Sequence, residues 1–234
     1  MKIYDIIADN YDQIFPLGED RLDFVKSLLK PKDKLLDIGC GTGALCIEMA
    51  KAGYRSSGID LNSKMIEIAR QEQTQNADFQ IMDMSEIEKH FAKTDFSLIS
   101  SFGNTLPHLD SLEKMADFFR QVHSCLTPDG HFVFQILNYD KILRQGKCDF
   151  PEIKTRNFIF TRKYEFLEGK IGFTIELAMG GKKMSDTTLL FPLKKEAALS
   201  LLNKAGFREI HSYKNYQLNP ADGGEFATLY AARK

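Results

Sequence analysis

Three glycines fall within five positions of the stretch LLDIGCGTG, residues 35–43, and an aspartate, Asp37, precedes them. Glycine loses more backbone freedom on folding than any other residue, so such a cluster is costly inside regular structure. A glycine-rich turn between a strand and a helix, however, lets the backbone approach a ligand closely. The free N–H groups at the start of the helix suit a carboxylate or a phosphate. The stretch therefore indicates a loop that binds a small molecule.

Two further acids are spaced as partners of this loop. Asp60 lies 17 residues after Gly43, near the separation at which an acid meets the hydroxyl pair of a ribose, and Asp83 follows the next expected strand. The dinucleotide fingerprint G-x-G-x-x-G is not matched, because the sequence reads GCGTGA from Gly39 and GTGALC from Gly41. The spacing predicts a nucleoside site that does not require a pyrophosphate.

Alternating strands and amphipathic helices must position these residues. Short apolar runs predict strands at 34–38, 54–60, 78–82, 96–102 and 131–137. Helical periodicity and capping residues predict helices at 20–29, 44–52, 63–75, 85–92 and 111–126. Alternation at this rhythm is typical of a parallel sheet with helices on both faces.

A different pattern interrupts the alternation after the fifth strand. Apolar and polar residues alternate, with tight turns between the runs, at 157–166, 170–179 and 187–193. This period of two predicts an antiparallel meander. We interpret residues 140–192 as an insertion that serves as an acceptor lid or a dimer surface, and residues 1–139 with 193–234 as the core domain.

The end of the chain completes the expected sheet. A helix at 194–205, closed by Gly206 in a position suited to a left-handed C-cap, precedes strands at 207–213 and 226–233. The link between these two strands is too short for a helical crossover, so we expect them to be antiparallel. The predicted fold is an α/β, doubly wound, mostly parallel seven-stranded sheet with an antiparallel last strand, plus a small antiparallel β insertion.

Composition restricts the partners of the 234-residue chain. Its 32 acidic and 31 basic residues nearly cancel, which argues against nucleic acid or a membrane surface as a partner. No apolar run approaches the ~20 residues of a spanning helix, and no signal peptide is evident. The four cysteines lack CxxC spacing, which favours reduced thiols in a cytoplasmic protein. The scattered histidines predict no metal site.

Taken together, the glycine stretch, Asp60, Asp83 and LTPDGHFVFQI at 126–136 resemble the class I, Rossmann-like S-adenosylmethionine (SAM)-dependent methyltransferases over nearly the whole chain. The resemblance implies SAM as the cofactor. It also implies a set of cofactor-binding residues in the core: Asp37, Gly39, Cys40, Gly41, Gly43, Asp60, Leu61, Asp83, Met84, Ser101 and Phe102.

The family's pattern implies separate roles for several of these residues. Asp60 would accept hydrogen bonds from both ribose hydroxyls, and Leu61 would pack on the adenine. Asp83, with the backbone of Met84, would contact the amino edge of the adenine. Asp37 would be oriented towards the ammonium of the cofactor.

The stretch SSFGNTLPHL, residues 100–109, resembles a segment of glycine N-methyltransferases and related small-molecule N-methyltransferases. The resemblance implies that Asn104 contacts the acceptor and that His108 lies near the methionine end of the cofactor. Thr-Leu-Pro stands where the glycine-specific enzymes carry serine and an aromatic residue, so glycine itself is not established as the acceptor.

The N-terminal YDQIFPLGEDR, residues 11–21, resembles the cap segment of the same enzymes. There Tyr11 would cover the sulfonium, because an aromatic face attracts a cation, and Arg21 would pair with the cofactor's carboxylate. Tyr4 is a further candidate on the acceptor side.

The sequence thus predicts an enzyme that moves a methyl group to a small-molecule acceptor by in-line displacement, with an amine nitrogen preferred. Attack by nitrogen, oxygen or carbon stays open, as does a monomer or a homodimer. Two alternatives remain: a nicotinamide-dependent oxidoreductase, which the glycine spacing disfavours, and a catalytically silent SAM-binding module.

Overall fold

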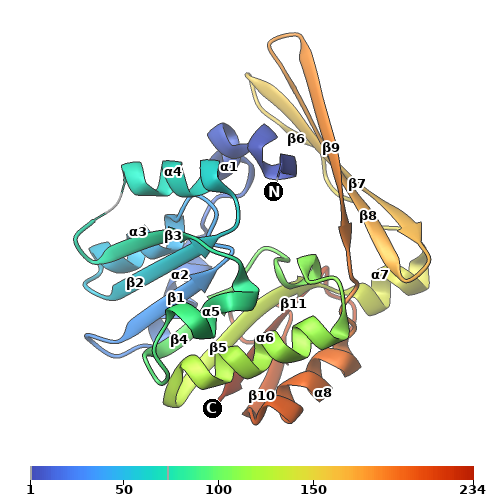
Figure 1. The fold of residues 1–234 in the computed structure, drawn as a ribbon. Helices are drawn as coiled ribbons and strands as arrows, with labels where there is room; N and C mark the ends of the chain where they lie inside the picture. The colour runs from blue at the N-terminus through green and yellow to red at the C-terminus, as the bar shows by residue number, and fades with distance from the viewer. Residues whose placement is uncertain (1, 73) are drawn as a thin grey trace.

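A computed structural model describes residues 2–72 and 74–234, which fold into a seven-stranded sheet flanked by helices and a separate four-stranded sheet (Figure 1). The order of the larger sheet is β10-β11-β5-β4-β1-β2-β3. Its strands are β1 (Lys34–Ile38), β2 (Arg55–Asp60), β3 (Ala77–Ile81), β4 (Phe96–Ser101), β5 (Leu126–Leu137), β10 (Arg208–Tyr213) and β11 (Ala227–Arg233).

Strand directions in the larger sheet match the prediction. The β1, β2, β3, β4 and β5 strands are parallel to their neighbours in that set, whereas β11 is antiparallel to both β5 and β10. The doubly wound sheet with an antiparallel last strand is therefore confirmed. β5 starts at Leu126, five residues before the expected 131, and its first part is irregular, with a φ of 64° at Asp129.

Helices follow the strands as the alternation predicted. The α-helices around the larger sheet are α2 (Glu19–Ser27), α3 (Ala44–Lys51), α4 (Ser63–Gln71), α5 (Ile87–His90), α6 (Leu112–Cys125) and α8 (Lys195–Ala205). Asn62 caps α4, because its side chain accepts a hydrogen bond from the Met65 amide at 3.0 Å. Gly206 ends α8 with a φ of 97°, a conformation that glycine adopts without strain.

Both faces of the larger sheet are covered. Consecutive residues of β1, Leu35 and Leu36, are fully buried in two different hydrophobic clusters, because successive side chains of a strand point to opposite faces. One cluster joins β1 to α2 and α3, and the other joins it to α6 and α8. This double burial explains the continuous apolar runs of the central strands.

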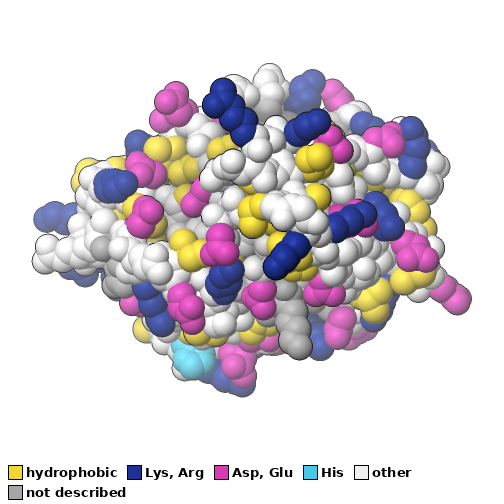
Figure 2. Space-filling model, turned by 90° about the horizontal axis from the view of Figure 1, so that it is seen from above, with side chains coloured by type: hydrophobic (Ala, Val, Ile, Leu, Met, Phe, Trp, Pro, Cys, Tyr) yellow, Lys and Arg dark blue, Asp and Glu magenta, His cyan; other side chains and the backbone are white. Residues whose placement is uncertain are grey.

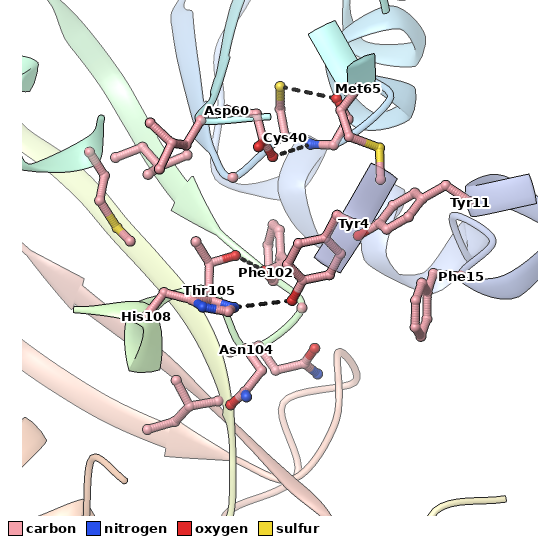
Figure 3. Close-up of a pocket in the computed structure, with 18 of the residues that line it drawn as sticks. Tyr4, Tyr11, Phe15, Cys40, Asp60, Met65, Phe102, Asn104, Thr105 and His108 are labelled. Carbon is pink, nitrogen blue, oxygen red and sulfur yellow. Dashed lines mark hydrogen bonds between the residues drawn. The ribbon is translucent and has the colours of Figure 1, made fainter. Parts of the chain in front are cut away.

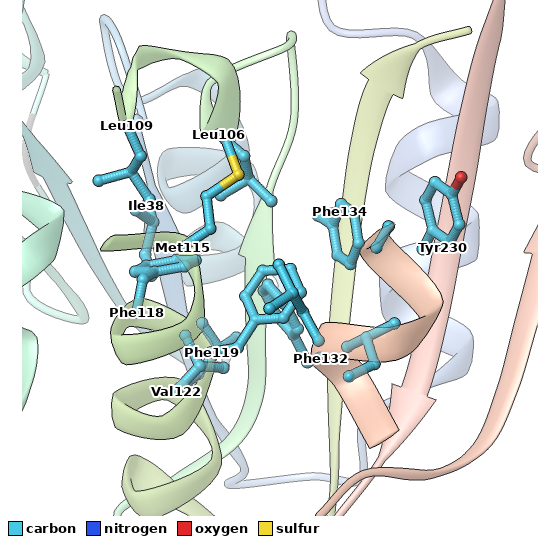
Figure 4. Packing of buried hydrophobic residues seen from close by; sticks show 14 of the residues in the cluster. Ile38, Leu106, Leu109, Met115, Phe118, Phe119, Val122, Phe132, Phe134 and Tyr230 are labelled. Atoms are coloured by element: carbon cyan, nitrogen blue, oxygen red, sulfur yellow. The ribbon is translucent and has the colours of Figure 1, made fainter. Parts of the chain in front are cut away.

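Aromatic rings dominate the face under α6 and α8 (Figure 4). The rings of Phe134 and Tyr230 stack with centroids 4.8 Å apart, and Phe132 stacks on Phe134 at 5.0 Å. Phe119 of α6 meets both phenylalanines edge-on or tilted. Burying each such side chain stabilises the fold by about 1.5–3 kcal/mol, so this cluster holds β5 and β11 against α6.

The predicted meander forms the smaller sheet, ordered β6-β7-β8-β9 and antiparallel throughout. It follows helix α7 (Tyr139–Gln145), and its strands are β6 (Ile153–Lys154), β7 (Phe158–Leu167), β8 (Lys170–Met179) and β9 (Lys182–Leu190). β9 begins five residues before the expected 187, because Gly180 and Gly181 form a tight turn that pairs Met179 with Lys182. The division into a core domain and an insertion at 140–192 stays a prediction.

The N-terminal segment lies between α4 and the smaller sheet (Figure 1). It consists of η1 (Lys2–Ile6), η2 (Ala8–Asn10) and α1 (Tyr11–Ile14). Ile3 and Ile7 are buried in a cluster with Met65 of α4 and with Phe160 and Ile175 of the smaller sheet. The segment thereby connects the two sheets across the carboxyl edge of the parallel strands.

The outer surface mixes charges of both signs, as the composition indicated. Lysine and arginine side chains alternate with aspartate and glutamate over the face seen in Figure 2. In the part of the chain that the structure describes, no helix is long and apolar enough to cross a membrane.

Candidate active site

A cavity of about 660 Å³ opens where β1, β2 and β4 end, between the N-terminal segment and the smaller sheet (Figure 3). Its volume suits an organic ligand of ordinary size. Most of the residues predicted for the site line it: Tyr4, Tyr11, Arg21, Asp37, Gly39, Cys40, Gly41, Asp60, Leu61, Asp83, Met84, Phe102, Asn104 and His108. The fold therefore brings together residues that lie up to 104 positions apart in the sequence.

The glycine loop between β1 and α3 forms one wall. Gly39 and Gly41 have φ values of 72° and 57°, which other residues adopt only with strain. A Cβ on Gly39 would lie 2.5 Å from the side chain of Thr105, and one on Gly41 would lie 2.9 Å from the ring of Tyr11. Glycine is required here by conformation and by space, so the backbone stays open to a ligand.

Asp60, at the end of β2, is hydrogen-bonded to this loop. One carboxylate oxygen accepts a hydrogen bond from the Gly41 amide at 3.0 Å, and the other accepts one from the Asn62 amide at 2.8 Å. Burial raises the pKa of Asp60, and these backbone hydrogen bonds oppose the rise. Each carboxylate oxygen keeps a further lone pair, so the side chain can still accept hydrogen bonds from two hydroxyls of a ligand.

Asp37 and Arg21 place opposite charges at one end of the cavity. Asp37 is 6% exposed and accepts a hydrogen bond from the Ser100 hydroxyl at 2.7 Å. Burial raises its pKa to about 7, although Ser100 and the charge of Arg21 oppose the rise. The Arg21 guanidinium lies 5.4 Å from the ring centre of Phe102 and 5.7 Å from that of Tyr216. This pair of charges suits the ammonium and carboxylate of an amino-acid group.

The rim on the β2 and β3 side carries the remaining predicted residues. Leu61 is 48% exposed at the cavity, which leaves its side chain available to pack on a flat ring. Asp83 accepts a hydrogen bond from the Ser85 amide at 2.8 Å and so caps the short helix η3 (Met84–Glu86). Capping leaves its second carboxylate oxygen free of recorded bonds among the described residues. Asp60 and Asp83 thus face one shared cavity.

Two predicted residues lie behind the lining. Ser101 is fully buried, and its hydroxyl donates a hydrogen bond to the Ile38 carbonyl at 3.0 Å. Gly43 begins α3 with a φ of 81°, and a Cβ there would meet the ring of Phe79 at 2.5 Å. Both support the loop from beneath, and their direct contact with a cofactor stays a prediction.

Tyr4 and His108 form a hydrogen-bonded pair that lines the cavity (Figure 3). The Tyr4 hydroxyl is hydrogen-bonded to Nε2 of His108 at 3.0 Å, which joins η1 to the short helix η4 (Leu106–His108). Burial lowers the pKa of His108 to about 4 and raises that of Tyr4 above its usual range. Both side chains are uncharged at neutral pH.

Asn104 anchors the loop after β4 to three other elements. Its φ of 68° lies in the left-handed region that asparagine tolerates. Its carbonyl oxygen accepts a hydrogen bond from the Leu137 amide at 3.0 Å, and its amide donates to the Tyr139 hydroxyl at 2.9 Å. The Tyr164 hydroxyl of β7 lies 3.4 Å from the same amide. Asn104 therefore links the parallel sheet to the smaller one at the cavity.

The aromatic wall on the smaller sheet was missed by the sequence analysis. Its residues from β7 and β8 are Phe160, Arg162, Tyr164 and Phe173, which line the cavity. Phe15 of the N-terminal segment and Phe150, which precedes β6, line it beside them. The alternation along 157–166 did carry a signal, because Arg162 falls on the same face as Phe160 and Tyr164. An arginine within an otherwise apolar face deserved a functional interpretation.

The described residues contain no group of side chains suited to bind a metal ion. Within residues 2–72 and 74–234, no three histidine, cysteine, aspartate or glutamate side chains are placed to hold an ion. The expectation of a site without metal stays a prediction.

Comparison with known families is consistent with this geometry. A family model described as a methyltransferase domain matches residues 29–206. A crystal structure of a SAM-dependent methyltransferase from Clostridium acetobutylicum superposes with a TM-score of 0.82 at 17% identity, covering 98% of each chain. At that identity the likeness concerns the fold.

Curated relatives divide by how much of the chain they match. The putative methyltransferase YqeM of Bacillus subtilis is 28% identical to this chain. The alignment covers 60% of this chain and 58% of the relative's length. A glycine/sarcosine N-methyltransferase of Aphanothece halophytica is 26% identical over 83% of this chain and 74% of its own. Relatives named as ubiquinone biosynthesis O-methyltransferases match 54% of this chain.

Proposed function

This chain belongs to the methyltransferase-domain family and uses SAM, and from that premise we propose that it transfers a methyl group to the amine nitrogen of a small-molecule acceptor. The acceptor enters the half of the cavity between the Tyr4–His108 pair and the smaller sheet. The alternatives of a nicotinamide-dependent oxidoreductase and a silent SAM-binding module are distinguished by the experiment below.

The cofactor half of the cavity fits SAM residue by residue. Asp60 receives the ribose hydroxyls, Asp37 and Arg21 receive the ammonium and carboxylate, and the glycine loop lets the ligand approach the backbone. Asp83, Met84 and Leu61 hold the adenine at the rim. When bound, SAM supplies an electrophilic methyl group on its sulfonium.

Tyr11 is placed to face that positive centre. Its ring lies against Gly41, and burial raises the pKa of its hydroxyl, so it presents a neutral aromatic face. Such a face attracts a cation by about 0.5–2 kcal/mol. Because its ring covers the loop at Gly41, Tyr11 would also help to exclude water from the reacting centre.

The low pKa of His108 is the main observation in favour of nitrogen, rather than oxygen, as the atom that accepts the methyl group. Burial that disfavours an imidazolium also disfavours an ammonium in the same cavity, so it lowers the pKa of a bound amine and favours the form with a free lone pair. A neutral amine attacks without a general base, whereas a hydroxyl acceptor needs one with a pKa near the working pH. The uncharged Tyr4 and His108 fit the orientation of an amine better than the activation of a hydroxyl.

The extent of the alignments supports the same choice. An alignment over 83% of the chain has to include part of residues 140–192, because that segment makes up more than a fifth of it. The relative with that coverage is named as an N-methyltransferase, whereas those named as O-methyltransferases match little more than half of the chain. The smaller sheet lines the acceptor side, so resemblance across it bears on the acceptor.

A paired acceptor screen tests the proposal. The chain is incubated with SAM and with matched pairs in which an amine is replaced by a hydroxyl, and the release of S-adenosylhomocysteine (SAH) is measured. We expect release with amines, methyl on nitrogen by mass spectrometry, and no release from Asp60→Ala, which loses the ribose acceptor. Release with the hydroxyl partners alone would contradict nitrogen as the acceptor.

Two further outcomes identify the alternatives. Binding of SAM by calorimetry without SAH release from any acceptor would indicate a silent module. Binding of NAD in preference to SAM would indicate an oxidoreductase.

A further inference from the structure

Two arginines line the cavity from different elements. Arg21 belongs to α2 and stands at the cofactor end, near Asp37. Arg162 belongs to β7 and stands in the aromatic wall of the smaller sheet. In both side chains Nε is buried and has no hydrogen-bond partner among the residues that the structure describes. The cavity thus holds two guanidinium groups that the protein itself leaves incompletely bonded.

Arg162 is surrounded by rings rather than by acids. Its guanidinium carbon lies 4.8 Å from the ring centre of Phe150, 5.3 Å from that of Phe15 and 5.5 Å from that of Phe160. No ion pair to it is recorded within the described part of the chain, although fourteen other pairs are. The rings pack around the guanidinium, and the Arg162 side chain lines the cavity.

The aromatic rings alone do not offset the free energy that the Arg162 charge loses on burial. Burial among these rings lowers the pKa of Arg162, and Cys148 and Tyr164 oppose the fall. Cation–π contacts offset only part of the free energy that a charge loses on leaving water. An anionic oxygen group restores it, because a guanidinium binds carboxylate and phosphate through paired hydrogen bonds.

The cofactor does not account for Arg162. SAM carries one carboxylate, and Arg21 is placed to receive it beside the ammonium partner Asp37. Arg162 instead shares its strand and its face with Tyr164, which contacts the acceptor-side Asn104. A second anion at this place therefore belongs to a second ligand.

We propose that Arg162 binds an anionic oxygen group of the methyl acceptor, so that the substrate is an amine that also carries a carboxylate or a phosphate. The inference rests on the proposed function, because it places the acceptor in the same cavity. The amine then lies towards Tyr4 and His108, and the anion lies against the smaller sheet.

Nuclear magnetic resonance of the arginine side chains tests this directly. The Nε–H signal of Arg162 in the nitrogen-15-labelled protein is assigned by its absence in Arg162→Gln, and acetate or methyl phosphate is added with and without saturating SAH. SAH occupies the cofactor half, so an anion bound only at Arg21 is displaced. We expect a saturable shift of the Arg162 signal in the presence of SAH, with acetate and methyl phosphate distinguishing the two kinds of anion.

Variants separate charge from packing. Arg162→Gln should weaken binding of the anion at least ten-fold, and Arg162→Lys should retain part of it. Arg156→Gln is the matched control, because Arg156 is exposed just before β7 and lies outside the cavity. With matched acceptors, an amino acid and its carboxamide, Arg162→Gln should raise KM at least ten-fold for the acid and leave the amide within two-fold.

Each failure has its own signature. An Arg162 signal that ignores both anions, or an Arg162→Gln variant that binds them as tightly as the natural chain, would overturn the inference while SAH binding still supports the proposed function. Failure of the protein to bind SAH would overturn the proposed function, and the titration of the ligand-free protein would still decide what Arg162 binds.

Discussion

The hydroxyl of Tyr4 and Nε2 of His108 lie 3.0 Å apart, although 104 residues separate them in the chain. The contact joins the first helical turn of the chain to the turn that follows β4, across the mouth of the cavity. It means that the acceptor side of the site is complete only when the N-terminal segment is packed over it. The Tyr4–His108 hydrogen bond therefore couples the packing of the N-terminal segment to the orientation of the acceptor.

Removal of this hydrogen bond should affect the acceptor and not the cofactor. Tyr4→Phe keeps the ring in its hydrophobic cluster and loses only the hydroxyl. A hydrogen bond of this kind contributes about 0.5–1.5 kcal/mol, so we expect kcat/KM for the acceptor to fall up to about ten-fold. The SAM affinity, measured by calorimetry, should stay within two-fold.

Tyr54→Phe is the control for Tyr4→Phe, because Tyr54 lies outside the cavity. It should leave both measurements unchanged. Full activity in Tyr4→Phe would remove the hydroxyl from the acceptor site.

His108 should make the stability of the protein sensitive to acid. Its pKa is about 4 in the folded chain and about 6.5 when unfolded, so the unfolded state binds more protons between these values. Stability is then complete above pH 6.5 and is lost as the pH falls towards 4, by up to ~2 kcal/mol at pH 5. We expect His108→Asn to show a smaller loss of unfolding free energy between pH 7 and pH 5 in urea titrations. Parallel curves for the two proteins would mean that His108 is solvated.

The sequence predicted the sheet well, because the evidence for it is local. The apolar run 96–102 and the short run 34–38 each carry their own burial pattern, and the two strands pair as parallel neighbours once helices cover both faces. The start of β5 was displaced by five residues, and so was the start of β9. The β9 boundary depends on the cross-strand pairing of Met179 with Lys182, which no local pattern in a lysine-rich stretch reveals.

The sequence analysis named Asp60, Asn104 and His108 among the residues that line the cavity, but for a related reason it missed those of the smaller sheet. Asp60 and the glycine loop are recognised by spacing along one βαβ unit. Arg162 and Phe150 enter the cavity only because the smaller sheet folds back over the larger one. Such a contact depends on tertiary packing, and the alternation that places Arg162 on the apolar face does not show that this face lines a cavity.

Asp37 should make SAM binding dependent on pH. With a pKa of about 7, the ligand-free side chain is largely protonated at pH 6, and an ammonium binds its ionised form. The apparent Kd for SAM should therefore rise about ten-fold from pH 8 to pH 6, as calorimetry would show. Asp37→Asn cannot ionise, so it should bind more weakly at pH 8 and lose this dependence. The ammonium of SAM itself titrates in the same way with the natural chain and with Asp37→Asn, so comparing the two proteins isolates the contribution of Asp37.

Asp78→Asn is the matched control, since Asp78 is exposed on β3 and lies outside the cavity. It should reproduce the pH dependence of the natural chain. Equal pH dependence in Asp37→Asn would show that Asp37 does not face the ammonium.

Gly41→Ala separates backbone strain from obstruction of the site. Gly41 has a φ of 57°, and an added Cβ would lie 2.9 Å from the Tyr11 ring. Gly53, with a φ of 92°, has nothing within 4 Å of such a Cβ and lies outside the cavity, so Gly53→Ala introduces the strain alone. That strain costs about 1–3 kcal/mol, so both variants should unfold at a lower temperature, by roughly 2–4 °C per kcal/mol in a chain of this size.

Only Gly41→Ala should also weaken SAM binding, by at least about ten-fold in calorimetry, because Tyr11 has to move from the loop that it covers. If Gly41→Ala bound SAM as Gly53→Ala does, the loop would not be the surface on which the cofactor lies.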